Sequence, residues 1–91
     1  MAIGIYFHPA SLSTQQYDDA TRRLELAGAG KPKGRLFHSA FGEGSSLSVY
    51  EVWESQADLD AFGKTLMPIL AEVGIEPGTP DIVPMHNLIF G

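Results

Sequence analysis

Cysteine is absent from this 91-residue chain, and basic residues are few. Without cysteine the protein forms neither a disulfide framework nor a thiolate metal site. Its six Lys and Arg residues are outnumbered by eleven Asp and Glu residues, which leaves a net charge of −5. A negatively charged chain is repelled by a phosphate backbone and by an anionic membrane surface. The sequence therefore predicts neither a nucleic acid nor a membrane as a partner.

Long apolar runs are lacking as well. No stretch approaches the roughly 20 apolar residues of a membrane-spanning helix. The N-terminal segment MAIGIYFHPA lacks the basic region of a secretory signal. These two absences predict a cytoplasmic protein. With 44% hydrophobic residues, the chain is expected to form one domain over residues 1–91. A domain of this size is only modestly stable alone, so that oligomerisation would help it.

Several chemical motifs are also missing. No Gly-rich phosphate loop follows an expected strand, no G-x-S-x-G motif is present, and no stripe of basic and aromatic residues indicates RNA binding. The histidines at positions 8, 38 and 86 show no spacing typical of a metal site. A structural zinc ion would need four clustered ligands. The sequence therefore predicts no metal centre within one monomer, and a site shared across a dimer is the remaining alternative.

The residues that are present alternate between strand and helix patterns. Residues 2–7 are β-rich and end at a His-Pro pair, which is typical of a strand. The helix that follows begins at the N-cap Ser13, where Gln16 completes a capping box, and a glycine at 28 or 30 ends it. Further strands are expected at residues 35–41, 47–53 and 81–90.

A second helix is expected to begin at Ser55 and to end before Gly74. Pro68 lies in its interior, where proline removes a backbone hydrogen bond, and we expect a kink or a second short helix from that point. In the last strand Pro84 cannot donate to a neighbouring strand, which favours a position at the edge of the sheet.

The order β-α-β-β-α-β predicts an α+β protein with the ferredoxin-like fold. In this fold a four-stranded antiparallel sheet of strand order 4-1-3-2 carries both helices on one face. The first and last strands bear apolar residues on both faces. A large apolar face needs a partner, and the simplest partner is a second copy related by two-fold symmetry. The sequence therefore predicts a homodimer that forms through the sheet faces.

The segment VYEVWESQADLDAFGKTLMPIL resembles the third strand and second helix of the antibiotic-biosynthesis-monooxygenase-like proteins. GRLFHSAFGEG and PMHNLI resemble a small, mostly uncharacterised bacterial subgroup, and the likeness covers nearly the whole chain. It implies a dimeric α+β barrel with a pocket between sheet and helices, into which Glu51 and Trp53 look. The superfamily includes cofactor-free oxygenases and haem-degrading enzymes. The second helix lacks the histidine that the latter use for iron, so we expect no cofactor.

The segment SVYEVWES raises the question of an active site, because alternation puts Glu51 beside Trp53 on one face of a strand. A buried carboxylate suits a general acid or base. In the alternative interpretation Glu51 lies at the margin of the sheet and pairs with Arg35 or with backbone amides. Trp53 is either a core residue or a surface on which substrate binds.

His38 shares the face of Glu51 if Glu43-Gly44 is a two-residue turn, since position 38 then opposes position 49. A longer loop or a bulge would change this register. A histidine in a pocket shuttles protons, and the alternative is a histidine bonded to a backbone carbonyl. His86 and Asn87 are adjacent in the last strand, so one of them should face the pocket.

Two classes of function remain after these exclusions. The first is a cofactor-free oxygenase or related proton-transfer enzyme for a small apolar or aromatic substrate, in which His38 or Glu51 removes a proton and the carbanion reacts with O₂. His86 or Asn87 would bond a developing oxyanion. The apolar wall would consist of Tyr17, Trp53 and Phe62. The second is a non-catalytic dimer that binds a small ligand or serves in assembly. An enzyme or a binding protein needs a cavity of at least about 300 Å³, whereas a core packed solid by Trp53, Phe62 and Leu66 would favour the second class.

Overall fold

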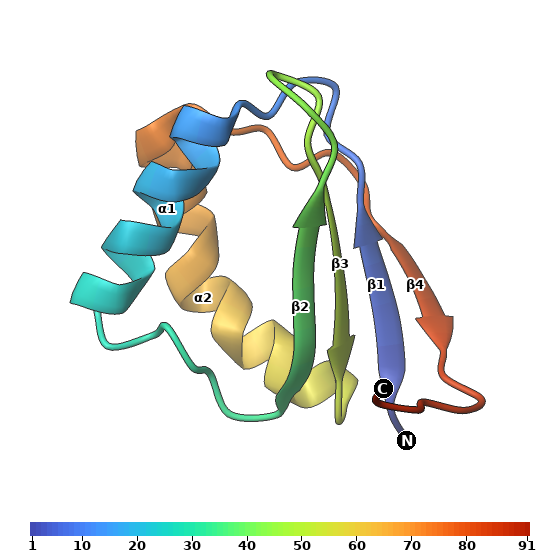
Figure 1. Cartoon of the computed structure of the whole chain (residues 1–91). Helices are drawn as coiled ribbons and strands as arrows, with labels where there is room; N and C mark the ends of the chain where they lie inside the picture. Colours follow the sequence, from blue (N-terminus) through green and yellow to red (C-terminus); the bar gives the residue numbers. More distant parts are fainter.

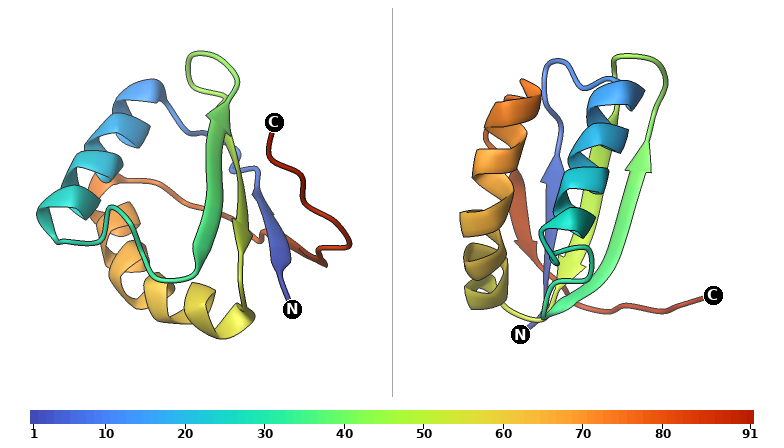
Figure 2. Two further views of the ribbon diagram at one scale, coloured as in Figure 1. Left: turned by 60° about the horizontal axis from the view of Figure 1, so that its bottom comes forward. Right: turned by 90° about the vertical axis from the view of Figure 1, so that its left-hand side faces the viewer.

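The computed structural model describes all 91 residues, and it confirms the ferredoxin-like α+β fold. The elements, in chain order, are β1 (Ile3–Phe7), α1 (Thr14–Leu26), β2 (Arg35–Phe41), β3 (Ser48–Trp53), α2 (Gln56–Val73) and β4 (Asp81–Pro84). One antiparallel sheet has the order β2-β3-β1-β4, which is the predicted order seen from the other edge. Both helices cover the same face of this sheet (Figures 1 and 2).

The start of α1 is capped as predicted, and the cap also joins the two helices. The Ser13 hydroxyl accepts a hydrogen bond from the Gln16 backbone, and the Gln16 side chain accepts one from the Ser13 backbone, each at 3.0 Å. The Gln16 amide donates to the carbonyl of Gly74 at 3.2 Å. Gly74 ends α2 in the left-handed conformation at φ 82°. The beginning of α1 is therefore tied to the end of α2.

The helix α2 continues through Pro68, so of the two predicted alternatives the second short helix is wrong, and a kink at Pro68 stays a prediction. The proline removes one backbone hydrogen bond, but the turn that follows it is held by packing. Ile69 is buried in a cluster with Leu47 and Val49, and this burial keeps the last turn against the sheet. Neither helix of the protein is both long enough and apolar enough to cross a membrane.

The last strand is shorter than predicted. β4 ends at Pro84, which pairs with Ile3, and the only further bond runs from the Met85 amide to the carbonyl of Ala2 at 2.9 Å. No backbone hydrogen bond to the segment of β1 follows this one, and residues 86–90 are not paired with another strand. His86 and Asn87 are consequently exposed and lie outside any strand, so the prediction that one of them faces the pocket is wrong. Pro84 does lie on an edge strand, as predicted.

The β2–β3 connection is longer than the two-residue turn considered for Glu43-Gly44. Phe41 and Ser48 form the last pair, so the loop comprises residues 42–47. This loop is held against the segment before α1, because the Leu12 amide bonds to Ser45 and the Leu47 amide bonds to Leu12, each at 3.0 Å. His38 consequently opposes Glu51. The register differs from the predicted one by two residues, an even number, and His38 remains on the face of Glu51.

The core is divided into two clusters under the helices. One contains Ile5, Trp53, Leu59 and Phe62, and the other contains Leu12, Ala20, Leu47, Val49, Ile69 and Ile75.

Candidate functional site

Glu51 is the one charged side chain of the core, with 4% of its surface exposed. Its Oε1 accepts a hydrogen bond from the indole N–H of Trp53 at 2.9 Å, and its Oε2 lies 2.5 Å from Nδ1 of His38. Nη1 of Arg35 lies 3.9 Å from the same Oε2, which is an ion pair but not a hydrogen bond. The predicted pairing with Arg35 is therefore present, but in the interior. Both carboxylate oxygens have donors, as burial of a charge requires.

His38 links Glu51 to the helix α1. Its Nε2 lies 2.6 Å from the hydroxyl of Tyr17, and the two rings stack with their centroids 5.9 Å apart. Since a carboxylate only accepts, the proton of a neutral imidazole is assigned to Nδ1, and Nε2 then accepts from the Tyr17 hydroxyl. We call these three residues the Tyr17–His38–Glu51 chain. It has the order of donor, base and orienting carboxylate found in nucleophilic triads.

The Tyr17–His38–Glu51 chain is assembled from three elements. The His38–Glu51 pair arises from the strand register, which places the two residues directly opposite each other. Tyr17 lies on the first turn of α1, where the capping box sets the direction in which the helix leaves the loop. The helical pattern placed Tyr17 on the buried face, but nothing in the sequence indicated that its hydroxyl would reach a histidine.

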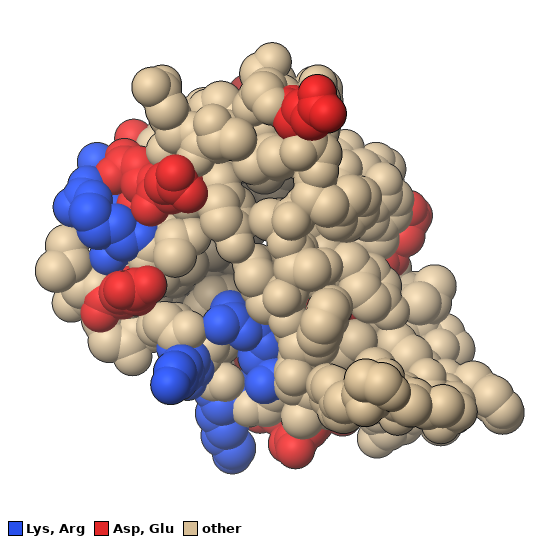
Figure 3. Space-filling model, viewed as in Figure 1, with Lys and Arg blue, Asp and Glu red and all other residues tan.

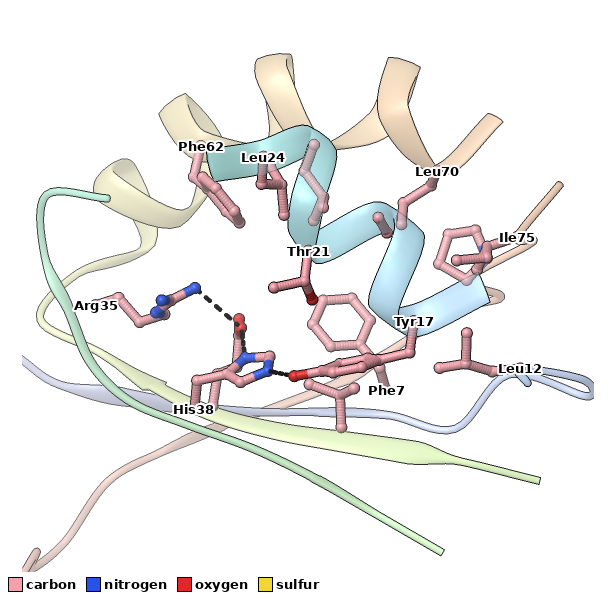
Figure 4. A pocket seen from close by; sticks show the side chains of 15 residues that line it. Phe7, Leu12, Tyr17, Thr21, Leu24, Arg35, His38, Phe62, Leu70 and Ile75 are labelled. Atoms are coloured by element: carbon pink, nitrogen blue, oxygen red, sulfur yellow. Dashed lines mark hydrogen bonds and ion pairs between the residues drawn. The ribbon is translucent and has the colours of Figure 1, made fainter. Parts of the chain in front are cut away.

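The Tyr17–His38–Glu51 chain borders a small cavity between the sheet and the helices (Figure 4). The volume of this cavity is about 90 Å³, and ten of its fifteen lining residues are hydrophobic. The Tyr17–His38–Glu51 chain therefore faces an apolar space. Typical ligand pockets measure about 300–1,000 Å³, whereas an engineered cavity of about 150 Å³ holds benzene. The cavity therefore holds a few atoms of a ligand and not a whole polycyclic molecule. The lining includes Tyr17, Thr21, Arg35, His38, Glu51 and Phe62.

Trp53 is placed behind this cavity and not in its wall. The side chain is fully buried and packs against Phe62, with the ring centroids 5.3 Å apart. Its connection to the site is the hydrogen bond to Glu51. Of the predicted wall of Tyr17, Trp53 and Phe62, the first and the last line the cavity. Trp53 therefore holds the carboxylate in position.

The remaining histidines lie away from the site. His86 and Asn87 do not line the cavity. The Nε2 of His8 lies 2.9 Å from the carboxylate of Asp81, a contact between the end of β1 and the start of β4 at the surface. Nowhere in the chain do three or more His, Asp or Glu side chains gather in an arrangement suited to a metal ion.

Comparison with known proteins identifies relatives in structure only. No family model matches the chain, and no curated protein matches it. A provisionally assigned antibiotic biosynthesis monooxygenase from Chloroflexus aurantiacus superposes with a TM-score of 0.65 at 18% identity, over 100% of both chains. SnoaB, a cofactor-independent oxygenase from Streptomyces nogalater, gives a TM-score of 0.64 at 11% identity over 97% of this chain and 94% of its own.

A further structure, provisionally assigned as an antibiotic biosynthesis monooxygenase of Caulobacter crescentus, gives a TM-score of 0.61 at 18% identity. It covers 97% of this chain and 91% of its own. At these identities the comparisons show a common fold. The protein therefore has the ferredoxin-like fold of these structures, and its function must be argued from the site.

Proposed function

We propose that the protein is a cofactor-independent, monooxygenase-like enzyme that removes a proton from a small apolar or aromatic substrate. The observation that carries this proposal is the Tyr17–His38–Glu51 chain at the wall of an apolar cavity. The likeness in fold to a cofactor-independent oxygenase supports it. A base that is oriented by a buried carboxylate and faces a water-poor space is suited to proton abstraction.

In the proposed reaction Tyr17 passes its hydroxyl proton to Nε2 of His38 and takes the proton of an acidic C–H group of the substrate. The positive charge on the imidazole is stabilised by the carboxylate of Glu51, 2.5 Å from Nδ1. The carbanion transfers one electron to O₂, which gives a substrate radical and superoxide. These two radicals combine to a peroxide anion, which takes up the proton that was removed from the substrate and becomes a hydroperoxide. Loss of water then converts the original CH₂ group into a carbonyl, so that the substrate supplies all the electrons.

Oxygen uptake tests this proposal. A panel of small phenols and cyclic 1,3-diketones is incubated with the protein in an oxygen electrode. We expect oxygen uptake that depends on the protein, and His38→Gln should lower kcat/KM by about 100-fold, because Tyr17 then lacks the base that accepts its hydroxyl proton. His86→Gln is the matched control, since His86 is exposed and lies outside the cavity. Equal rates for the wild type and His38→Gln would exclude His38 as the acceptor of the Tyr17 proton.

The cavity volume of about 90 Å³ favours a second candidate function, a non-catalytic dimer that binds a small ligand or serves in assembly. The Tyr17–His38–Glu51 chain would then be a structural hydrogen-bond network that orders the core. Absence of oxygen uptake with every member of the panel, together with saturable binding of one of them, would support this second function in place of the first.

The proposed function includes a homodimer formed through the face of the sheet opposite the helices. Strand pairing places exposed aromatic and aliphatic side chains on this outer face. They are Tyr6, Phe37, Phe41 and Val83. Two of these side chains, Phe37 and Phe41, lie on β2. Residues 85–90, which were predicted to add apolar side chains to this face, lie outside β4. Tyr6 and Phe41 stack with centroids 6.3 Å apart, which makes the patch continuous.

Sedimentation tests this dimer. The wild type should sediment as a dimer at micromolar concentration, and Phe41→Lys should shift it to a monomer, because a charge would be buried in the interface. Met67→Lys is the control, since Met67 is an exposed apolar residue on α2, away from the sheet face. A monomeric wild type at this concentration would contradict the proposal.

A further inference from the structure

Arg35 stands between two hollows of the protein. It lines the apolar cavity together with His38, and the same two residues line a second, outer hollow of about 310 Å³ along the free edge of β2. The rest of this outer hollow is formed by Lys31, Pro32, Leu36 and Phe37. Its volume falls in the range of ligand pockets, which the inner cavity does not reach. A ligand in the outer hollow would therefore contact both Arg35 and His38.

A β-bulge places Arg35 in this position. Arg35 pairs with Trp53 and His38 pairs with Glu51, so three steps along β2 correspond to two steps along β3. In a regular strand Arg35 and His38 would point to opposite faces. The extra residue near Leu36 turns the guanidinium to the face of His38. Bulges are frequent beside active sites, where they redirect a side chain.

The guanidinium of Arg35 is held in place but retains unused donors. Its Nη2 donates to the carbonyl of Gly30 at 2.9 Å, and its Nη1 is 3.9 Å from Glu51. The two oxygens of Glu51 already accept from Trp53 and His38. Arg35 therefore makes one hydrogen bond with a group that has five donors, and 21% of its side chain is exposed toward solvent.

The basic residues near the outer hollow differ from those of α1 in their ion pairs. Arg22 and Arg23 on α1 both pair with Asp19, and the hydrogen bond from Arg22 lowers the pKa of the Asp19 carboxyl. Lys31 has no ion pair within the chain, and Lys31, Lys33 and Arg35 lie within five residues. Figure 3 shows these two groups of basic side chains, one among acidic residues over α1 and one over the loop that leads to β2.

We propose that Arg35 binds the carboxylate of an aromatic or similarly planar monoanionic substrate in the outer hollow. The planar fork of a guanidinium matches a carboxylate with two parallel hydrogen bonds. Leu36, Phe37 and Pro32 supply apolar contacts for the body of the ligand, and Lys31 lies at the rim. A net charge of −5 disfavours a polyanion such as a phosphate ester. The inference rests on the proposed function for the identity of the site and adds the class of substrate.

Binding of benzoate and of its neutral analogue benzamide tests the proposal without any turnover. In a titration followed by ¹H–¹⁵N NMR, benzoate should shift the amide signals of residues 30–38 and saturate. Benzamide should bind at least about 10-fold more weakly, because hydrogen bonds to charged groups contribute more than those to neutral groups. A higher salt concentration should lower the affinity for benzoate and leave the affinity for benzamide unchanged.

Variants separate the fork of Arg35 from charge in general. Arg35→Gln should weaken benzoate binding at least about 10-fold, and Arg35→Lys should give an intermediate loss, because it keeps the charge without the fork. Lys64→Gln is the matched control: it makes the same change of charge on α2, outside both hollows. Retained dispersion of the NMR spectrum shows that each variant is folded. A second variant, Lys31→Gln at the exposed rim, should lower the affinity for benzoate about twofold.

Three results would overturn the inference: no binding of benzoate up to about 10 mM, equal affinity for benzoate and benzamide, or unchanged benzoate affinity in the folded Arg35→Gln variant. These outcomes are independent of oxygen uptake. Benzoate binding that depends on Arg35, without uptake for any compound, would retain the anion site and exclude the enzyme. Oxygen uptake that depends on His38, in a protein that does not bind benzoate, would support the proposed enzyme and exclude the anion site.

Discussion

Replacing Trp53 by alanine is expected to lower the free energy of unfolding by about 4 kcal/mol, the largest effect of any single change considered for this protein. The side chain is completely buried and packs with Ile5, Leu59 and Phe62 in one of the two core clusters. Alanine would leave a cavity at the centre of that cluster and would also remove the donor to Glu51. For a domain of this size the melting temperature should fall by at least about 15 °C.

Chemical denaturation followed by circular dichroism measures this effect, because the variant retains no tryptophan for fluorescence. Trp53→Phe is the control that keeps most of the ring and loses only the indole N–H. It should cost about 1–2 kcal/mol, since one acceptor of a buried carboxylate loses its donor. A loss below about 1 kcal/mol for Trp53→Ala would contradict the packing of the cluster.

Replacing Glu51 by alanine should cost about 3 kcal/mol, although it removes a buried charge. The reason is that the indole N–H of Trp53 and the Nδ1–H of His38 both lose their acceptor inside the protein. Arg35 also loses its partial counter-charge. Unfolding in urea at neutral pH, with the wild type and variant at equal concentration, measures the difference directly.

Glu51→Gln is the matched variant for this experiment. Its amide oxygen can accept from Trp53, and its NH₂ group can donate to Nδ1 of His38, which then carries its proton on Nε2. We expect a stability within about 1 kcal/mol of the wild type and an exchanged imidazole tautomer, which ¹⁵N NMR detects. With its proton on Nε2, His38 could no longer accept the hydroxyl proton of Tyr17, while the fold persists. Equal stability of the alanine and glutamine variants would show that the two donors find other acceptors.

The pairing of His38 with Glu51 shows how far a strand pattern carries a prediction. Alternation in SVYEVWES placed Glu51 and Trp53 on the face under the helices, where the structure has them. The sequence left the length of the turn open, and loop 42–47 is longer than two residues because it is held by hydrogen bonds to Leu12, a residue distant in sequence. His38 remained on the correct face because the register changed by an even number of residues.

The error at β4 has a different cause. The apolar residues after Pro84 have the composition of a strand, but a strand lasts only as long as its neighbour. β1 begins at Ile3, and the last backbone hydrogen bond between the two segments joins the Met85 amide to the carbonyl of Ala2. His86 and Asn87 were therefore assigned to a site that they do not reach. Composition within a segment contains no information about the length of its partner.

By itself the sequence determined the order of the elements, the capping of α1, the face on which Glu51 and Trp53 lie, and the absence of thiolate chemistry. These features depend on neighbours within a few residues, for which spacing and side-chain type are sufficient. Only the tertiary structure decided that the hydroxyl of Tyr17 reaches His38, that a bulge turns Arg35 to the same face, and that the cavity measures about 90 Å³. Each of these depends on how closely α1 packs over the sheet and on which residues of two strands pair. Such contacts join residues far apart in the chain, and their geometry is set by the packing of the whole domain.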